Sequence, residues 1–307
     1  ALEAVKKIKQ GDLTAEMLMR SCLDRVLERD NEVKAWAHLD PEQAIERARN
    51  ADERGNQGPL AGIPVAVKDI IDTADMPTRH GSAIYECNQP IIDAAVVSKT
   101  RSTGGVIMGK TVTTEFAWRN PGATRNPHNL NHTPGGSSSG SAAGIADYQF
   151  PLAFGTQTGG SVIRPAAYCG VVGFKPTFGS YDRKGVKELS SYLDTVGIMG
   201  RSVQDVALFD SVLRGNGSTS APSLDNASLR IGVFVPFRES AEHHALLALD
   251  AGVQTAEKVG ATVVDIATSE KFEILADIHN VVMTGDAGRA LAWEYDHHHE
   301  KLTQFYT

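Results

Sequence analysis

The sequence predicts an α/β protein whose sheet is covered by helices on both faces. From about residue 60 onward, short runs that are apolar on every residue alternate with longer segments that have one apolar face. A strand that is apolar throughout is typical of a sheet buried on both sides, and alternation with helices is typical of the α/β class. Hydrophobic residues make up 41% of the chain and charged residues 22%, which is the composition of a globular protein.

The first sixty residues predict helices. Thr14 is a suitable N-cap for a helix over 15–30, whose apolar residues fall on one face. Asp40 is the expected cap of a second helix over 41–54. This helix opens with a proline, which is favoured in the first turn, and Gly55 ends it.

After residue 60 the pattern of strand, helix and strand recurs without an internal repeat. Periodicity and the positions of glycine and proline set the expected bounds of each element. The expected elements are strand 63–67, helix 93–103, strands 104–109, 152–156 and 229–235, helix 241–259 and strand 261–267.

Charge, hydropathy and cysteine content exclude several classes of protein. The 307-residue chain has a formal net charge of −7 and no cluster of Lys and Arg, which argues against a nucleic-acid partner. No apolar run approaches the length of a bilayer-spanning helix, and the first residues lack the core of a signal peptide. Three cysteines without C-x-x-C spacing suit a reducing compartment. We therefore expect a cytoplasmic protein with no membrane partner and no cofactor.

The stretch PGGSSSGSAAG at 134–144 has the composition of a flexible linker. A linker should separate two segments that each look like a domain. This stretch instead lies between a strand-helix-strand unit and the strand predicted at 152–156. Its position within one α/β core indicates that it is part of the structure and not a spacer.

A second glycine-rich turn follows the strand at 152–156. Gly159 and Gly160 precede Ser161, so the backbone can turn tightly and leave N–H groups free to stabilise an oxyanion beside the serine hydroxyl. An ordinary tight turn is the competing interpretation. Lys68, at the end of the strand 63–67, is a candidate base, because partial desolvation lowers the pKa of a lysine. Its competing interpretation is a lysine whose head group lies in water.

Three stretches together closely resemble the amidase signature family: IPVAVKD (63–69), PGGSSSGSAAG (134–144) and GTQTGGSVIRPA (155–166). The resemblance is most specific over 60–180. It implies a mixed, mostly parallel β-sheet sandwiched between α-helical layers, and a Ser-cisSer-Lys triad in place of Ser-His-Asp.

The resemblance assigns roles to individual residues. Lys68 matches the family's catalytic lysine, Ser137 its bridging serine and Ser161 its nucleophile, with the two serines 24 positions apart as is usual in the family. A cis peptide bond is implied before Ser137. The family's oxyanion-hole N–H groups correspond to Thr158, Gly159 and Gly160.

Two positions depart from the common family pattern. Gln157 stands where an acidic residue is usual, and the arginine after the nucleophile comes one position late, at Arg164. The malonamidase-like branch shows this same form, and its arginine is thought to hold a substrate carboxylate. Arg164 is therefore a candidate carboxylate clamp, since a guanidinium matches a carboxylate with two hydrogen bonds. A structural salt bridge is the alternative. Arg164, Gly136 and Gln157 are the expected substrate-binding residues.

Two further motifs suggest other functions. The stretch 104–111 fits the phosphate-loop pattern G-x-x-x-x-G-K-[ST], but an apolar strand occupies the place of the loop and a helical segment precedes it. The run of histidines at 297–299, with Glu294, suggests a metal site, yet adjacent helical residues point about 100° apart and cannot all face one ion. The same argument applies to the adjacent histidines His243 and His244. We therefore expect neither nucleotide binding nor a metal.

The combined expectation is a hydrolase that cleaves the C–N bond of small linear amides. A carbamate (urethane) or urea presents the same carbonyl to the same nucleophile, so a urethanase is an alternative. A glutaminase-type subunit of an amidotransferase, which works with partner subunits, is another. A homodimer stays open. We expect one domain over 1–307, with a helical part over 1–60, a catalytic core over 61–200 and a remainder over 201–307. Because the family is usually longer, we expect the C-terminal part of its fold to be missing from this chain.

Overall fold

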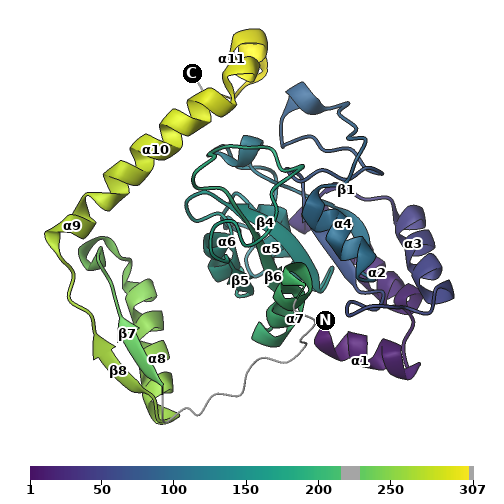
Figure 1. The fold of residues 1–307 in the computed structure, drawn as a ribbon, viewed down its shortest axis with the longest axis horizontal. Coiled ribbons are helices and arrows are strands. Elements are labelled where there is room, and N and C mark those ends of the chain that lie inside the picture. Colours follow the sequence, from purple (N-terminus) through teal and green to yellow (C-terminus); the bar gives the residue numbers. More distant parts are fainter. Residues whose placement is uncertain (216–228, 304–307) are drawn as a thin grey trace. The chain divides into compact units, whose positions relative to one another are not determined.

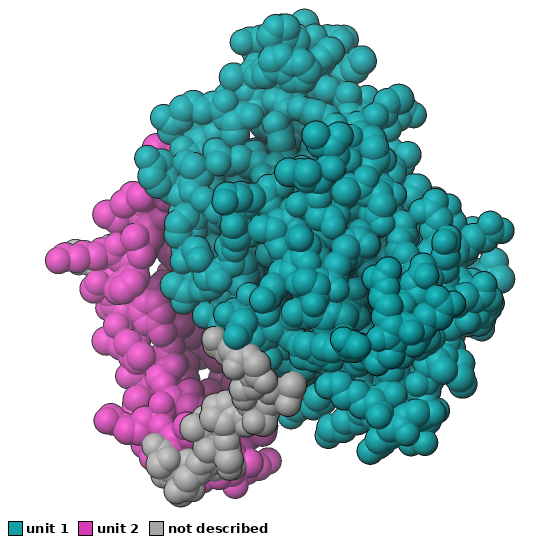
Figure 2. Space-filling model, turned by 45° about the vertical axis from the view of Figure 1, so that its right-hand side comes forward, with its two compact units in different colours: residues 1–220, 285–307 teal, residues 221–284 magenta. Residues whose placement is uncertain are grey.

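The computed structural model describes residues 1–215 and 229–303 (Figure 1). By its internal contacts the chain divides into two compact units, residues 1–220 with 285–307 and residues 221–284 (Figure 2). Each unit is described by itself below. The expectation of a single domain over 1–307 stays a prediction.

The first unit is built on a six-stranded mixed sheet. Its strand order is β1-β3-β2-β4-β6-β5. The central strand β2 pairs in parallel with β3 and with β4, whereas β1, β6 and β5 add antiparallel pairs toward the two edges. The strands are β1 (Trp36–His38), β2 (Pro64–Lys68), β3 (Val106–Thr111), β4 (Leu152–Gln157), β5 (Val172–Phe174) and β6 (Thr195–Gly200).

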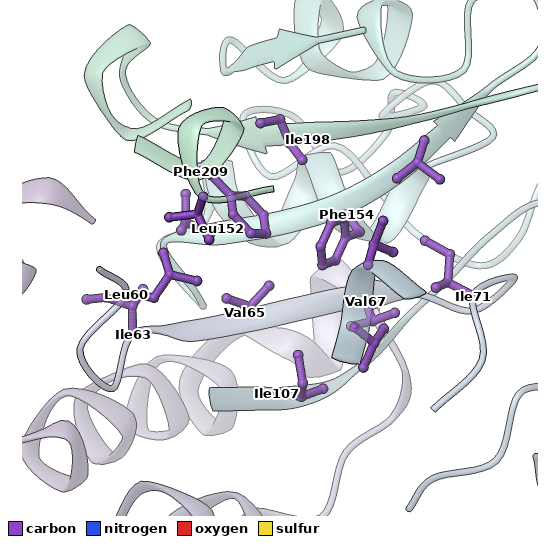
Figure 3. Packing of buried hydrophobic residues seen from close by; sticks show 14 of the residues in the cluster. Leu60, Ile63, Val65, Val67, Ile71, Ile107, Leu152, Phe154, Ile198 and Phe209 are labelled. Carbon is purple, nitrogen blue, oxygen red and sulfur yellow. The ribbon is translucent and has the colours of Figure 1, made fainter. Parts of the chain in front are cut away.

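Two apolar clusters cover the two faces of this sheet. Successive side chains of β2 alternate between them: Val65 and Val67 join one cluster and Ala66 joins the other. Figure 3 shows the first cluster, in which Phe154 of β4 packs near Phe209. The first cluster receives side chains from α1 (Leu2–Gln10), α4 (Ala95–Ser102) and α7 (Val203–Arg214). The second receives them from α2 (Ala15–Val33), α3 (Pro41–Glu53) and α5 (Ser139–Ala146). The predicted α/β class and the sheet between helical layers are confirmed.

The predicted helix caps are also confirmed. The Thr14 side chain accepts the N–H of Met17 at the start of α2, and Asp40 accepts the N–H of Gln43 at the start of α3. The strand expected at 104–109 begins two residues later, at Val106. The reason is that Gly104 has a φ of +90° and completes the turn that follows α4, with its N–H bonded to the carbonyl of Arg101.

The second unit contains a parallel strand pair, β7 (Arg230–Val233) and β8 (Thr262–Asp265), connected through α8 (His243–Lys258). These elements match the strand, helix and strand predicted there, with shorter bounds. Two more helices follow, α9 (Glu270–Glu273) and α10 (Leu275–Ala290). The chain re-enters the first unit at residue 285 within α10 and continues into α11 (Ala292–His298).

Candidate active site

Lys68 is the last residue of β2 and is completely buried. Its Nζ lies 2.7 Å from Ser137 Oγ and 2.7 Å from Thr156 Oγ1, with the carbonyl oxygen of Thr156 at 3.4 Å. The central position of β2 explains this placement, because strands on both sides shield the lysine stem from water. The sequence pattern that predicted a desolvated lysine at this strand end is therefore matched by the structure.

Burial lowers the pKa of Lys68 from its ordinary 10.5 to about 7. The negative charge of Asp194 acts in the opposite direction and favours the ammonium form. The other charged pair buried at these strand ends, Asp69 and Lys110, is joined by an ion pair of 3.1 Å. Lys68 is thus a buried amine that can gain or lose a proton near neutral pH.

Ser137 is held by the loop between β3 and α5. The peptide bond between Gly136 and Ser137 is cis, as the family resemblance implied. The carbonyl of Ser137 accepts the N–H of Thr114 at 3.1 Å. Gly135 has a φ of +76°, and a Cβ there would stand 3.1 Å from the Cα of Pro165, so only glycine fits this approach. The loop delivers the Ser137 hydroxyl to the amine of Lys68.

Ser161 follows β4 and the two glycines, and it is 8% exposed. Its carbonyl accepts the N–H of Ser138 at 3.2 Å, so the main chains on the two sides of the candidate triad are hydrogen-bonded to each other. The structure therefore joins Lys68 to Ser137 by a direct side-chain contact and joins Ser161 to the same loop through the backbone.

The turn before Ser161 is braced from inside by Gln157. The side-chain oxygen of Gln157 accepts the N–H groups of Val162 at 2.9 Å and Ile163 at 3.0 Å, and its amide nitrogen donates to the carbonyl of Gly159 at 3.0 Å. All of these contacts are with the backbone of the turn. Gln157 was expected to bind substrate, and in the structure it shapes the turn. An uncharged amide suits that role, since it supplies an acceptor and a donor together.

The three candidate oxyanion-hole residues lie on the open side of this turn. Gly159 is exposed, while Thr158 and Gly160 are partly buried. The Thr158 hydroxyl donates to Asp194 at 2.5 Å. Backbone N–H groups in such a turn can stabilise negative charge on a carbonyl oxygen bound beside Ser161.

Arg164 contacts the backbone of the candidate site. Its Nε and Nη2 donate to the carbonyl of Gly136 at 3.0 and 2.6 Å, and its side chain is exposed. Among the residues that the structure describes, no carboxylate forms an ion pair with it. The structural salt bridge considered for this arginine is therefore replaced by a two-donor contact with the carbonyl just before Ser137.

Two residues of the site were not foreseen from the sequence. Thr156 provides the second oxygen contact of Lys68, and Asp194 is the acidic group that acts on Lys68 and binds Thr158. Thr156 could have been found from its position, since it lies on β4, the strand that leads to Ser161. Asp194 is 33 positions beyond Ser161, in a stretch without a distinctive motif.

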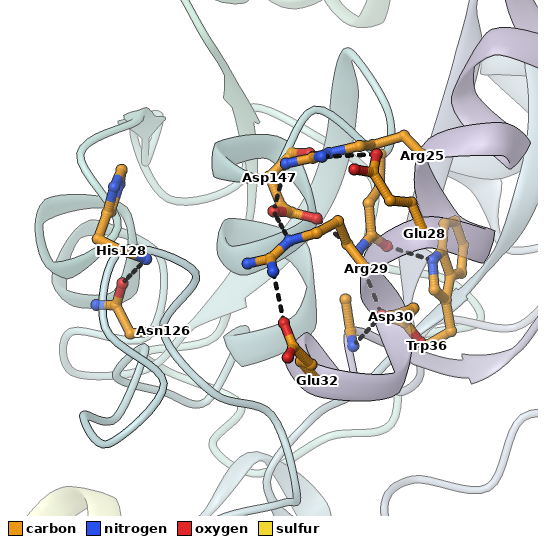
Figure 4. Close-up of polar contacts among 11 residues, drawn as sticks. Arg25, Glu28, Arg29, Asp30, Glu32, Trp36, Asn126, His128 and Asp147 are labelled. Carbon is orange, nitrogen blue, oxygen red and sulfur yellow. Dashed lines mark hydrogen bonds and ion pairs between the residues drawn. The ribbon is translucent and has the colours of Figure 1, made fainter.

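The helix that follows Ser137 is anchored at its far end. Arg25 and Arg29 of α2 both reach Asp147, which directly follows α5, at 3.1 and 3.4 Å (Figure 4). Beside them the Gln149 side chain accepts the indole N–H of Trp36 at 2.7 Å. These contacts anchor α5, which begins where the loop that carries Ser137 ends.

The loop before Ser137 is tied to the segment after Ser161. The side-chain oxygen of Asn126 accepts the N–H of His128 (Figure 4), and its amide donates to the carbonyl of Tyr168 at 2.9 Å. The ring of His128 contacts the carbonyl of Cys169 at 2.9 Å. These contacts hold the loop at 126–128 against the end of α6 (Ile163–Tyr168).

The competing motifs have structural explanations. Residues 106–111 form the fully buried strand β3, and the side chain of Lys110 donates to Thr78 and pairs with Asp69, so it cannot serve as a phosphate-loop lysine. His297 stacks on Trp293. Within residues 1–215 and 229–303, no cluster of three or more His, Cys, Asp or Glu side chains is arranged to hold a metal ion. The helices of the same residues include none that is long and apolar enough to cross a membrane.

Comparison with known proteins adds an independent line of evidence. The family model described as Amidase matches residues 17–305. A glutamyl-tRNA(Gln) amidotransferase subunit of Salinispora tropica is 39% identical over 295 residues, which cover 87% of this chain and 60% of that relative. This chain therefore spans about 60% of the length of that curated relative.

Solved structures give the same result for the fold. A structure described as a crystal structure of amidase has a TM-score of 0.90 at 30% identity, over 99% of this chain and 71% of that one. The native peptide amidase from Stenotrophomonas maltophilia has a TM-score of 0.82 at 28% identity, over 97% of this chain and 72% of that one.

Proposed function

Because the chain belongs to the amidase family, we propose that it hydrolyses the C–N bond of small linear amides through an acyl-enzyme on Ser161. Ser137 and Lys68 form the relay that moves the proton. The observation that supports this most is the 2.7 Å contact between Lys68 Nζ and Ser137 Oγ, made by a buried lysine whose pKa is about 7. A base with a pKa near the working pH is the most effective one.

The first half of the reaction forms the acyl-enzyme. Ser161 Oγ bonds to the amide carbonyl carbon while its proton passes to Ser137 Oγ, and the proton of Ser137 passes to the neutral amine of Lys68. The resulting oxyanion accepts hydrogen bonds from the backbone of the turn at 158–160. The C–N bond then breaks, and the relay returns one proton to the departing nitrogen, which leaves as a neutral amine or ammonia.

The second half releases the acid. Water attacks the ester carbonyl of acyl-Ser161 and gives its proton to the same relay, and the bond to Ser161 Oγ breaks as that oxygen regains a proton. Lys68 ends neutral, so the cycle needs no metal or cofactor to balance its protons. The expectation of no cofactor stays a prediction.

Carbamates and ureas are alternatives within the same chemistry. Each offers a carbonyl bonded to nitrogen, and the triad attacks that carbonyl in the same way. A panel of half-amides of dicarboxylic acids, aryl amides and carbamates, with kcat/KM for each, separates them.

A second candidate function is the glutaminase activity of an amidotransferase component. The observation that favours it is that several relatives, at 36–43% identity, are named as a subunit of glutamyl-tRNA(Gln) amidotransferase. On this alternative the chain releases ammonia only together with partner subunits. Release of ammonia from free amides by the purified chain alone would count against it.

Arg164 keeps two roles within the proposal. The contact of its fork with the carbonyl of Gly136 supports a role in holding the loop of Ser137. The resemblance to the malonamidase-like branch supports a second role, in which the exposed guanidinium leaves the carbonyl of Gly136 and binds a carboxylate of the substrate. If Arg164→Ala lowers kcat/KM equally for charged and neutral amides, the arginine holds the loop of Ser137 and does not bind a substrate carboxylate. Cytoplasmic location and a homodimer also remain proposals.

The experiment that tests the function is turnover of a small amide by matched variants. Ser161→Ala and Lys68→Ala should abolish turnover without unfolding the protein, and Lys68→Arg should not restore it, because a guanidinium does not act as a neutral base. Ser98→Ala, at an exposed serine of α4, is the matched control and should retain full activity. Full activity of Ser161→Ala would refute the assignment of the nucleophile, and inhibition by EDTA would refute the metal-free mechanism.

A further inference from the structure

Asp194 lies directly before β6 and is 8% exposed, with both carboxylate oxygens bonded. One oxygen accepts the hydroxyl of Thr158 at 2.5 Å. The other accepts the N–H groups of Leu189 at 2.8 Å and Ser190 at 2.9 Å. A carboxylate held by three donors has a fixed position.

This carboxylate is beside the candidate catalytic groups. Asp194, Thr156 and Thr158 line a cavity of only about 10 Å³, roughly the volume needed for one water molecule. An amide substrate cannot enter it. Asp194 also lines a hollow of about 320 Å³ together with Asp182 and Arg183. Both of its oxygens are already engaged by Thr158, Leu189 and Ser190, so we expect it to act on catalysis through the residues that it contacts or through its charge.

The support continues outward to the helix that returns from the second unit. The hydroxyl of Ser190, which is fully buried, donates to Asp286 of α10 at 2.6 Å. Asp286 is itself 5% exposed. In the same region Ala287 and Leu291 pack against Phe116 and Leu189. A continuous set of hydrogen bonds thus runs from residue 286 through Ser190 and Asp194 to the oxyanion turn.

We propose that Asp194 is a positioning residue of the active site, which fixes the oxyanion turn through Thr158 and acts on Lys68 through its charge, and that the bond between Ser190 and Asp286 makes the end of α10 part of this support. The inference rests on the proposed function for its kinetic consequences. Its effect on Lys68 does not depend on the substrate.

The charge effect has a definite sign. Asp194 favours the ammonium form of Lys68, against the desolvation that favours the neutral amine. Arg183 and Lys187 line the small cavity together with Asp194. Asp69, Asp72 and Lys110 are the charged groups near the ends of β2 and β3. Asp69 and Lys110 neutralise each other in an ion pair, and the charge of Asp72 acts on Lys110. Removing the charge of Asp194 should therefore lower the pKa of Lys68 further.

The central test compares Asp194→Asn with the unchanged protein. Asparagine has nearly the same shape and can still accept the two N–H groups while its amide faces the Thr158 hydroxyl, so mainly the charge is lost. We expect the rising acidic limb of the kcat/KM profile to move to lower pH. The same shift should appear in an NMR titration of protein carrying ¹³Cε-lysine, with the Lys68 signal identified by its loss in Lys68→Met.

Two further variants separate the hydrogen bonds from the charge. Thr158→Val removes the hydroxyl and keeps the charge, so kcat should fall about tenfold to a hundredfold, the range expected when an oxyanion donor is misplaced but not lost. Its KM and its Lys68 titration should stay unchanged. Ser190→Ala should lower kcat by about two- to fivefold, and full activity of this variant would overturn the role of α10.

Asp182→Asn is the matched control. Asp182 is an exposed carboxylate twelve positions before Asp194 that accepts the N–H of Lys184, and its replacement should alter neither kcat nor the Lys68 titration. If Asp194→Asn folds normally and leaves the Lys68 titration unmoved, the inference is wrong. If no amide is turned over but the titration still moves as expected, the proposed function fails and the action of Asp194 on Lys68 stands.

Discussion

The free energy of unfolding of Lys68→Met, measured relative to the unchanged protein, should be higher at low pH than at high pH. Methionine fills a similar volume but cannot ionise. In the unfolded chain Lys68 binds a proton up to its ordinary pKa of 10.5, whereas in the folded protein its pKa is about 7. Between these values the unfolded state holds more protons than the folded state, so the free energy of unfolding rises with pH.

The structure gives the magnitude. A pKa lowered from 10.5 to about 7 corresponds to about 5 kcal/mol. This contribution is fully present above pH 10.5, falls as the pH decreases and is lost below about pH 7. Between pH 6.5 and 8.5 the unchanged protein should gain about 2 kcal/mol relative to Lys68→Met. Methionine also loses the hydrogen bonds to Ser137 and Thr156. This loss changes the free energy of unfolding by a similar amount at every pH, so it does not affect the pH dependence.

Urea unfolding followed by tryptophan fluorescence measures this difference, because all three tryptophans, Trp36, Trp118 and Trp293, lie in the first unit. Lys9→Met, at an exposed lysine of α1, is the control and should give a difference that does not vary with pH. Curves for the unchanged protein and Lys68→Met that stay parallel from pH 6.5 to 8.5 would refute the argument that burial depresses this lysine.

Three other predictions follow from the same structure. The kcat/KM for a neutral amide should rise with pH through a midpoint near 7, since the relay needs neutral Lys68; an ammonia-release assay from pH 5.5 to 9 would contradict this with a flat profile. Gly140→Ala should lower stability by about 1–3 kcal/mol or more, because its Cβ would stand 2.2 Å from the carbonyl oxygen of Ala35. Gly252→Ala, which has open space in α8, should be neutral or slightly stabilising; equal melting temperatures by circular dichroism for the two variants would refute the packing argument. A thiol reagent should modify exposed Cys87 in the folded protein and spare Cys22 and Cys169, whose pKa values burial raises to about 11 and about 12; three reactive thiols without denaturant would be the contrary result.

The elements that the sequence predicted are those with a visible boundary or a polar face. The capped helices α2 and α3 and the apolar strands β2 and β4 fall in this group. Helix α5 was not foreseen, because residues 139–145 are all buried and a helix buried on every side has no polar stripe to reveal its period. Strand β6 was missed because Gly197 and Gly200 interrupt its apolar run.

The site residues that could be predicted are those marked by neighbouring residues in the sequence. The glycines beside Ser137 and Ser161 mark tight turns, and the resemblance of the three stretches to the amidase signature family assigned those serines their predicted roles. The partners of Arg164 and Gln157 are backbone groups, which every residue has, and no residue type in the sequence marks them. Asp194 acts across the fold from a loop with no motif of its own, so only the folded chain brings it to Lys68.

Two buried lysines on adjacent strands show why Lys68 in particular is suited to act as a base. Lys68 and Lys110 are both 0% exposed and lie on the parallel pair β2 and β3. Lys110 contacts the carboxylate of Asp69 at 3.1 Å, which opposes the effect of burial and stabilises its ammonium form. Lys68 contacts only uncharged oxygens, those of Ser137 and Thr156, and its carboxylate neighbour Asp194 is engaged by Thr158, Leu189 and Ser190. Burial lowers the pKa of both lysines, but the carboxylate of Asp69 opposes that effect at Lys110. Lys68 is held by two hydroxyls instead, which leaves an amine that can be neutral and accept a proton from the serine it already touches.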